Sequence, residues 1–273
     1  MAAITAAMVK ELREITGSGM MDCKKALGAT DGDMDKAVEW LRENGFMKAA
    51  KKAERIAAEG VCAAAVAEDG KSAAIVEVNS ETDFVAKNEK FTTFANQVAA
   101  KALKTAAADI EAFLEEEFEA GKSIKTALTE QIAVIGENMN IRRFAVLVEN
   151  DGLVESYIHG SRIGVLVALK TNVVNEAIKE AARNVAMQIA AMRPTYLNRD
   201  AVSKEYLDHE LEILKAQAAN DPKLSGKPAN VLENILKGQL NKELKEICLV
   251  DQVYVKDSSM TVQAYIDSVA KAE

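Results

Sequence analysis

Residues 61–79 read VCAAAVAEDGKSAAIVEVN, two runs of small and branched apolar residues around a polar loop. Asp69 and Gly70 lie in the middle of that loop and form a strong tight-turn signal. The two runs therefore predict an antiparallel β-hairpin. Because a tight turn makes neighbouring strands antiparallel, the strands and long helices of this chain do not indicate a parallel βαβ series. The stretch places the protein in the α+β class.

A second hairpin is expected further along the chain, where residues 153–160 (LVESYIHG) and 163–170 (IGVLVALK) read as strands with a tight connection. A helix rich in Val and Ala follows each hairpin, over residues 82–103 and 175–192. The order of these elements predicts two related halves, each an antiparallel sheet with helices.

The region between the hairpins has two predicted parts. Residues 109–138 read as helical, and residues 142–149 (RRFAVLVE) read as a strand. The end of the chain is expected to add a short strand in residues 251–256 and a helix over residues 259–272.

The N-terminal segment, residues 1–55, predicts three short helices. Asp33 is a good N-cap for the third, and we expect that helix to end before Gly45. Met20 and Met21 are adjacent, and neighbouring helix positions diverge by about 100°. At least one methionine is therefore expected at the surface, where its flexible thioether suits an adaptable contact, although loose packing in the core is an alternative.

Residues 199–247 contain two helices with apolar stripes around the loop NDPKLSGKP. The second stripe consists of leucines at every fourth position, namely Leu232, Leu236, Leu240 and Leu244. This pattern predicts an antiparallel helical hairpin that projects from the body as a coiled-coil arm.

Four parts follow from these patterns. They are an N-terminal helical domain (1–55), a first core half (56–148), a second core half (149–198 and 248–273), and the helical arm inserted in the second half (199–247).

Composition excludes several classes of protein. The chain has 273 residues, 49% of them apolar, and a net charge of −8, which argues against binding nucleic acid through phosphate neutralisation. No apolar run approaches the roughly 18–20 residues of a membrane helix, and residues 1–17 do not read as a signal peptide. Cys23, Cys62 and Cys248 are odd in number and far apart, so reduced thiols in a cytoplasmic protein are expected, with no metal site and no cofactor.

Motifs for bond-breaking chemistry are absent from the sequence. It contains no HExxH, no GxSxG and no GxxxxGK[ST], and its two histidines, His159 and His209, lie in different segments. His159 precedes Gly160 at a predicted turn, where it is either a partner contact or a residue without a role. Nothing nominates a nucleophile, a base and an electrophile together, so we expect that the protein is not an enzyme.

Phe84, within residues 80–91 (SETDFVAKNEKF), poses the main question of the sequence. On a continuous helix it would share a face with Phe91 and lie in the core. Asn88 is a good N-cap, however, and a helix that restarts there leaves Phe84 free to point outward. The residues alone leave both alternatives open.

Four stretches resemble the bacterial translation elongation factor Ts family, in order along nearly the whole chain. They are TGSGMMDCKKAL (16–27), NSETDFVAKN (79–88), IGENMNIRR (135–143) and YIHGSRIGVLVAL (157–169). Motifs of this length are specific.

The resemblance implies guanine nucleotide exchange on elongation factor Tu in its GDP-bound and nucleotide-free states, in the cytoplasm and without direct contact to nucleic acid or membrane. It implies that the N-terminal helices resemble a ubiquitin-associated domain and dock on the GTPase. It also implies that Asp83 and Phe84, flanked by Thr82 and Val85, push into the GTPase and disturb its magnesium ion, which loosens GDP. Secondary partner contacts carried over from the same motifs are Met20, Met21, Lys24, Ile135, Gly136 and His159.

Two further expectations accompany the resemblance. The family pattern continues with another strand, and often a helix, beyond the region that matches residues 264–273, so the second core half is expected to lack its last strand. The alternative to an exchange factor is an interaction scaffold, whose docking domain and arm tether partners without changing nucleotide affinity.

Overall fold

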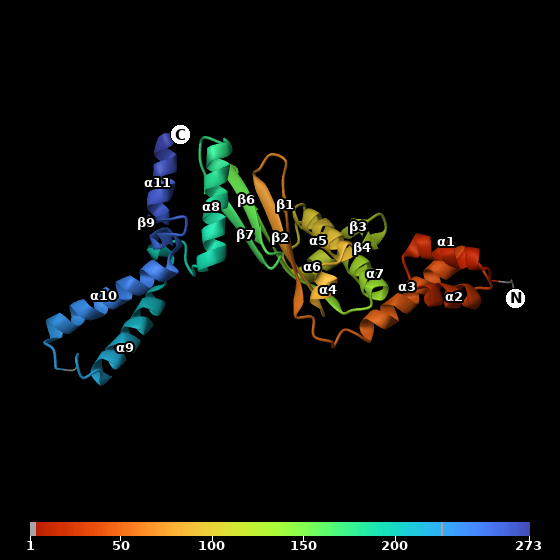
Figure 1. Ribbon diagram of the computed structural model, residues 1–273, viewed down its shortest axis with the longest axis horizontal. Coiled ribbons are helices and arrows are strands. Elements are labelled where there is room, and N and C mark those ends of the chain that lie inside the picture. The colour runs from red at the N-terminus through yellow and green to blue at the C-terminus, as the bar shows by residue number, and fades with distance from the viewer. Residues whose placement is uncertain (1–3, 225) are drawn as a thin grey trace. The chain divides into compact units, whose positions relative to one another are not determined.

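The computed structural model describes residues 4–224 and 226–273, which form helices and small sheets (Figure 1). This mixture confirms the predicted α+β class. The chain divides into two compact units, the first comprising residues up to Asn150 with 158–166, the second comprising 151–157 and 167–273. The finer division into a docking domain, two related core halves and an arm stays a prediction.

The first unit contains most of the sheet structure. Its helices are α1 (Ala6–Thr16), α2 (Met20–Ala29), α3 (Met34–Ala50), α4 (Asp83–Ala86), α5 (Glu89–Ala102), α6 (Ile110–Glu115) and α7 (Ile124–Ile135). Its strands are β1 (Glu59–Val66), β2 (Ser72–Ser80), β3 (Glu117–Glu119), β4 (Lys122–Ser123) and β5 (Met139–Val148). The paired strands β6 (Gly152–His159) and β7 (Ile163–Lys170) belong partly to each unit.

The first hairpin predicted from the sequence forms two strands of a three-stranded sheet in the order β1-β2-β5, with β2 in the centre. β1 and β2 are antiparallel, with Val61 opposite Val78, and β5 pairs with the other edge of β2. Gly70 in the connecting turn has a φ of 68°, which glycine adopts at little steric cost. Helix α5 packs on this sheet, and its Phe91 and Phe94 are buried in the same cluster as Val61 and Val78.

The turn between β6 and β7 lies against β1. The backbone N–H of Cys62 donates to the carbonyl oxygen of Ser161 at 2.7 Å, and the Cys62 thiol donates to the carbonyl oxygen of Arg162 at 3.3 Å. Gly164 lies so close to Ile75 that a Cβ atom on the glycine would be 2.2 Å from the Ile75 Cδ1 atom. The same Cβ atom would lie 3.1 Å from the Cβ atom of Cys62 in β1, so a side chain at this position would require the neighbouring side chains to shift.

The N-terminal helices α1 to α3 form a hydrophobic cluster of their own. The expectation that the third helix ends before Gly45 is wrong, since α3 continues to Ala50. Gly45 is buried, and a Cβ atom there would lie 3.2 Å from the Cβ atom of Ala133 in α7. The glycine therefore serves a close approach of two helices and not a helix end.

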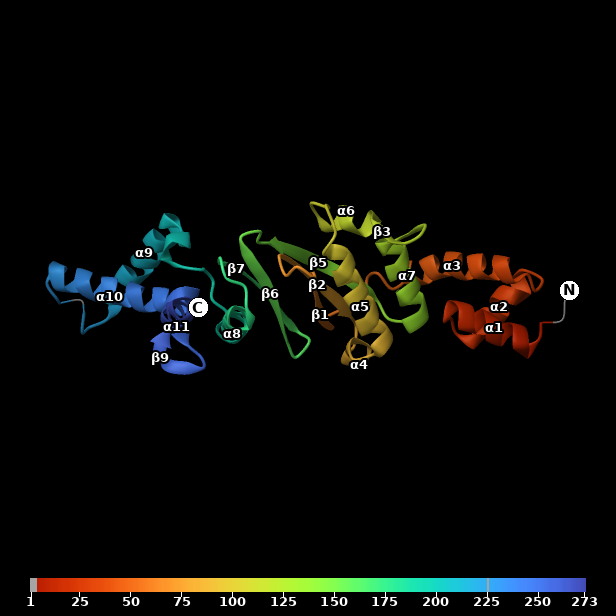
Figure 2. The same cartoon turned by 90° about the horizontal axis from the view of Figure 1, so that it is seen from above.

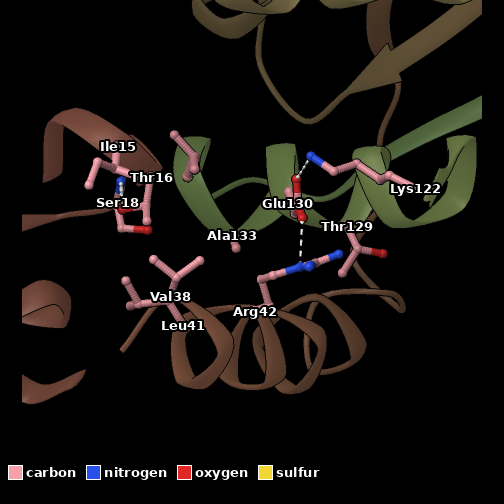
Figure 3. A pocket seen from close by; sticks show the side chains of 12 residues that line it. Ile15, Thr16, Ser18, Val38, Leu41, Arg42, Lys122, Thr129, Glu130 and Ala133 are labelled. Carbon is pink, nitrogen blue, oxygen red and sulfur yellow. Dashed lines mark hydrogen bonds and ion pairs between the residues drawn. The ribbon is translucent and has the colours of Figure 1, made fainter. Parts of the chain in front are cut away.

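A cavity of about 240 Å³ lies beside this close approach (Figure 3). Arg42 of α3 reaches across to Glu130 of α7, with 3.3 Å between nitrogen and oxygen, and Lys122 contacts the same carboxylate at 2.7 Å. Partly exposed ion pairs of this kind each contribute about 0–1 kcal/mol. The ion pairs to Glu130 therefore contribute little to the contact between α3 and α7.

The sequence indicates one helical region over residues 109–138, and this prediction is wrong. Helix α6 ends at Glu115, a small hairpin of β3 and β4 follows, and α7 begins at Ile124. Phe118 in this hairpin is buried, and its ring centroid lies 5.6 Å from that of Phe94. One buried aromatic side chain thus fixes a hairpin that the helical periodicity of the flanking residues conceals.

The second unit is mainly helical. Its elements are α8 (Glu176–Met192), η1 (Arg199–Ala201), α9 (Lys204–Asn220), α10 (Ala229–Ile247), η2 (Leu249–Asp251), β8 (Val253–Tyr254), β9 (Asp257–Thr261) and α11 (Val262–Ala272). Helices α9 and α10 lie side by side (Figures 1 and 2), and the Tyr206 hydroxyl donates to Glu243 across them at 2.7 Å. That these helices form a projecting coiled coil stays a prediction.

Two boundaries in the second unit differ from the sequence expectation. The first arm helix begins at Lys204 because residues 199–201 form a short 3-10 turn, and the last helix begins at Val262 because residues 257–261 form strand β9. Within residues 4–224 and 226–273, no helix is long and apolar enough to cross a membrane.

Candidate partner-binding site

A break between two helices exposes one phenylalanine at the end of β2. Helix α4 has only 4 residues, and α5 restarts after Asn88, whose side chain accepts a hydrogen bond from the backbone N–H of Lys90 at 2.9 Å. Phe84, in α4, is 83% exposed. Its placement in the core, one of the two alternatives left open by the sequence, is therefore wrong for the free chain.

The short helix beneath Phe84 is anchored at both ends. Thr82 caps it, since the backbone N–H of Val85 donates to the Thr82 hydroxyl oxygen at 3.4 Å. Ala86 is buried in the sheet cluster, and Val85 packs partly against the same cluster. Phe84 thus projects from a fixed turn, and a fixed turn loses less conformational entropy on binding than a mobile loop does.

Glu137, which lies between the end of α7 and the start of β5, binds this turn. The backbone N–H of Thr82 donates to Glu137 Oε2 at 3.0 Å, and the Thr82 hydroxyl donates to Glu137 Oε1 at 2.6 Å. Both oxygens of one carboxylate thereby bind one residue. Glu137 was not singled out from the sequence, although it lies in one of the quoted motifs, because the motif alone does not show which residue it contacts.

Asp83 is ionised and paired beside Phe84. The Lys87 amino group donates to its carboxylate at 2.7 Å, and this hydrogen bond holds the pKa of Asp83 below its usual range. The Arg162 guanidinium, in the turn after β6, acts on the pKa of Asp83 in the same direction. The turn therefore presents a large apolar side chain next to a fixed negative charge.

The turn that carries His159 lies beside the same end of the sheet. Arg162 forms an ion pair with Glu59, and Glu59 is the residue opposite Ser80, where β2 ends. His159 is exposed at the end of β6. The structure thus brings this turn and Thr82–Val85 to neighbouring positions.

Ile135 and Gly136 lie at the end of α7, directly before Glu137. Gly136 has a φ of 90°, and its carbonyl oxygen accepts a hydrogen bond from the Lys52 amino group. Burial lowers the pKa of Lys52. These two predicted contact residues therefore directly precede Glu137, which accepts two hydrogen bonds from Thr82.

Met20, Met21 and Lys24 belong to a different cluster. All three lie on α2, where Met20 is 56% exposed and Met21 is 66% exposed, so both methionines are at the surface. Their helix packs in the N-terminal cluster of α1 to α3. No contact described for residues 4–224 and 226–273 joins them to residues 82–85.

The site offers binding surface rather than reactive groups. In the described part of the chain, no group of three or more His, Cys, Asp or Glu side chains is arranged to hold a metal ion. An exposed aromatic ring, a fixed carboxylate and an anchored turn suit recognition of another protein.

Comparisons with known proteins identify the family of the chain. A family model described as "Elongation factor TS" matches residues 81–272. The protein named "Elongation factor Ts" from Clostridioides difficile (strain 630) is 52% identical over 273 residues, covering 100% of this chain and 88% of that protein. Proteins of the same name from Clostridium tetani and Trichlorobacter lovleyi are each 50% identical, covering 98% of this chain and 88% of their own length.

The family model covers the segment that carries Thr82–Val85, the junction at Glu137 and the turn at His159. The relatives extend the match to the N-terminal helices. On these matches, the chain belongs to the elongation factor Ts family.

Proposed function

We propose that this chain releases GDP from elongation factor Tu by pressing Phe84, with Asp83 beside it, into the GTPase, where they disturb the bound magnesium ion. The general activity follows from the family: the chain is a guanine nucleotide exchange factor for elongation factor Tu in translation elongation. Such a factor loosens a nucleotide and does not catalyse a chemical reaction in the usual sense. The exposure of Phe84 is the observation that carries the proposed mechanism.

Binding energy from Phe84 is sufficient for a large effect on GDP. Burying an exposed phenylalanine side chain yields roughly 1.5–3 kcal/mol. This energy accelerates release only if it is larger in the nucleotide-released state than in the GDP-bound state. Reciprocity then requires that GDP weakens the binding of this chain by the same factor as the chain weakens the binding of GDP.

The magnesium ion is a suitable target for a mechanical effect. It is the largest local charge at a nucleotide site, and it bridges phosphate oxygens and protein ligands. Magnesium demands near-ideal octahedral geometry, so a small displacement of its protein ligands weakens the hold on the nucleotide. A side chain that moves those ligands needs no chemistry of its own.

The remaining features of the proposal concern the wider contact. Met20, Met21 and Lys24 dock the N-terminal helices on the GTPase, while Ile135, Gly136 and His159 contact it around the exchange segment. The partner is bound in both its GDP-bound and nucleotide-free states, in the cytoplasm, and the chain's net charge of −8 disfavours a direct nucleic-acid contact.

Removing magnesium separates this mechanism from others. The test measures the release of a fluorescent GDP from elongation factor Tu by stopped flow, with and without this chain, in magnesium buffer and in excess EDTA. We expect strong acceleration in magnesium and a much smaller acceleration factor in EDTA, because the ion is then already gone.

Two results would contradict the proposal. An equal acceleration factor in both buffers would show that magnesium is not involved. Binding to elongation factor Tu without any acceleration would instead support the scaffold alternative.

A further inference from the structure

The antiparallel pairing of β2 and β5 continues beyond the sheet through side chains. The last backbone pair is Ser80 with Met139. One position further, the backbone N–H of Asn138 donates to the carboxylate of Glu81 at 2.5 Å. The positions 81 and 138 are opposite in the extended register, so a carboxylate replaces the next backbone acceptor.

The following pair repeats the arrangement with the roles of the two segments exchanged. The backbone N–H of Thr82 donates to Glu137 at 3.0 Å, and the positions 82 and 137 are again opposite in register. Glu81 and Glu137 therefore form a crossed carboxylate pair, in which each carboxylate binds the backbone of the other segment. Glu137 also accepts from the Thr82 hydroxyl at 2.6 Å.

The geometry points to Glu137 as a positioning residue for nucleotide exchange: by holding Thr82, it sets the direction in which Phe84 leaves the surface. This inference rests on the proposed function of Phe84. Glu137 acts through Thr82, which is the N-cap of α4.

A helix as short as α4 cannot set its own direction. Its 4 residues are far fewer than the roughly 12–15 needed for a marginally stable isolated helix, so its anchors determine its orientation. Ala86 anchors one end in the core, and Thr82 anchors the other. Hydrogen bonds to an ionised carboxylate are among the strongest in proteins, and two of them converge on Thr82.

Loss of the Glu137 carboxylate would remove two hydrogen bonds from Thr82 and leave the Ser80 hydroxyl, which donates to the Thr82 carbonyl oxygen at 3.1 Å, and the core contact at Ala86. Phe84 would then sample several directions, and ordering it would cost free energy at the moment of insertion. A misplacement of about 1 Å can reduce a rate by about a hundredfold.

Glu81 is less suitable for a test because its carboxylate also forms an ion pair outside the two segments. Its other oxygen pairs with Arg55 at 2.6 Å, and Asn138 donates through its side chain to the carbonyl oxygen of Arg55, also at 2.6 Å. Substituting Glu81 would therefore release the segment after α3 as well. Glu137 is the better choice, because both hydrogen bonds that its carboxylate accepts come from Thr82.

The experiment measures GDP release from elongation factor Tu over a range of concentrations of the full chain and of Glu137→Ala. We expect the plateau rate to fall by about tenfold while the half-saturating concentration changes by less than about twofold, since the other docking contacts are intact. A merely structural role would lower the folded fraction, which raises the apparent half-saturating concentration and leaves the plateau unchanged.

Conservative and coupled variants complete the test. Glu137→Gln keeps one acceptor oxygen and should restore part of the plateau rate. Thr82→Val removes the hydroxyl, and the double variant Thr82→Val with Glu137→Ala should be no slower than the slower single variant, because the two residues act as one unit. If Glu137→Ala fails to fold, the plateau rates of Glu137→Gln and Thr82→Val test the positioning role in its place. Normal plateau rates in both variants would overturn the proposal.

Glu116→Ala is the matched control. The Thr105 hydroxyl donates to Glu116 at 2.7 Å, so the variant removes the same kind of hydroxyl–carboxylate bond elsewhere in the first unit. Its plateau rate should equal that of the unmodified chain. An unchanged plateau in Glu137→Ala, or an equal loss in Glu116→Ala, would overturn the positioning role.

The variant Phe84→Ala distinguishes a failure of the positioning role of Glu137 from a failure of the proposed function of Phe84. If Phe84→Ala loses exchange and Glu137→Ala keeps it, only the positioning role fails. If Phe84→Ala itself keeps full exchange, the proposed function of Phe84 fails, whatever Glu137→Ala does.

Discussion

Phe84 and Phe91 are two helical turns apart in sequence, yet their surroundings are opposite. Phe84 is 83% exposed, and Phe91 is 0% exposed. Both lie in segments with helical backbone, α4 and α5. Chemical type and helical propensity are the same for both residues, so neither decides which one is buried.

The difference arises from the two residues that separate the helices. Lys87 closes α4, and Asn88 has an extended backbone, with φ −72° and ψ 132°, from which it caps α5. This break changes the direction of the chain, so the two phenylalanines do not share a face. One polar residue thereby separates a side chain that stabilises the protein from a side chain available to a partner.

The largest effect is expected at the buried member of the comparison. Phe91→Ala should lower the free energy of unfolding by about 3–5 kcal/mol, the cost of removing a fully buried aromatic ring from a packed core. Denaturant unfolding measures this change, and Phe91→Leu, which keeps most of the volume, is the control. A loss below about 1 kcal/mol would mean that the cluster of Phe91 and Phe94 is not the core of the first unit.

The residue that separates the two helices should have an intermediate effect. Asn88→Ala removes the cap of α5 and should cost about 1 kcal/mol, because a backbone N–H loses its side-chain acceptor. Asn88→Asp keeps an acceptor oxygen and should retain most of the stability. Equal melting temperatures for Asn88→Ala and the unmodified chain would show that the break does not depend on the cap.

The comparison also shows what the sequence could and could not predict. Asp69-Gly70 is a local turn signal that predicted the first hairpin, whereas Asn88 as a cap only allowed a helix break that the sequence left open. The direction of Phe84 stayed open, because it depends on how α4 is anchored to the core. Local patterns do not contain that information.

Errors occurred where a distant contact outweighs a local pattern. Gly45 looked like a helix end, but its role is the close approach of Ala133, which is remote in sequence. The β3–β4 hairpin was missed because Phe118 is held by Phe94, again a distant residue. Glu137 was missed as part of the candidate site for the same reason, since its partner Thr82 belongs to another motif.

The smallest effect is expected at the ion pair beside Phe84. Lys87→Ala should raise the pKa of Asp83 toward its ordinary value, because the hydrogen bond that lowers it is gone. A pKa that is lower in the folded chain favours folding at pH values above the ordinary carboxyl pKa, and this contribution is lost as the pH falls through the lowered value.

An NMR titration of the Asp83 carboxyl in both proteins measures this shift. Lys179→Ala, which removes a similar exposed pair with Glu176 on α8, should leave the pKa of Asp83 unchanged. An Asp83 pKa that is identical with and without Lys87 would show that the pair does not form in solution.

The most direct measurement compares Phe84→Ala with the unmodified chain in two assays, thermal unfolding and GDP release from elongation factor Tu. Phe46→Ala, which removes a half-exposed phenylalanine on α3, is the control. Because Phe84 contacts little in the free chain, stability should stay within about 0.5 kcal/mol. Loss of the roughly 1.5–3 kcal/mol of ring burial should slow release by about 10- to 150-fold at subsaturating chain. A large drop in melting temperature together with normal residual exchange would contradict the role of Phe84 and return it to the core.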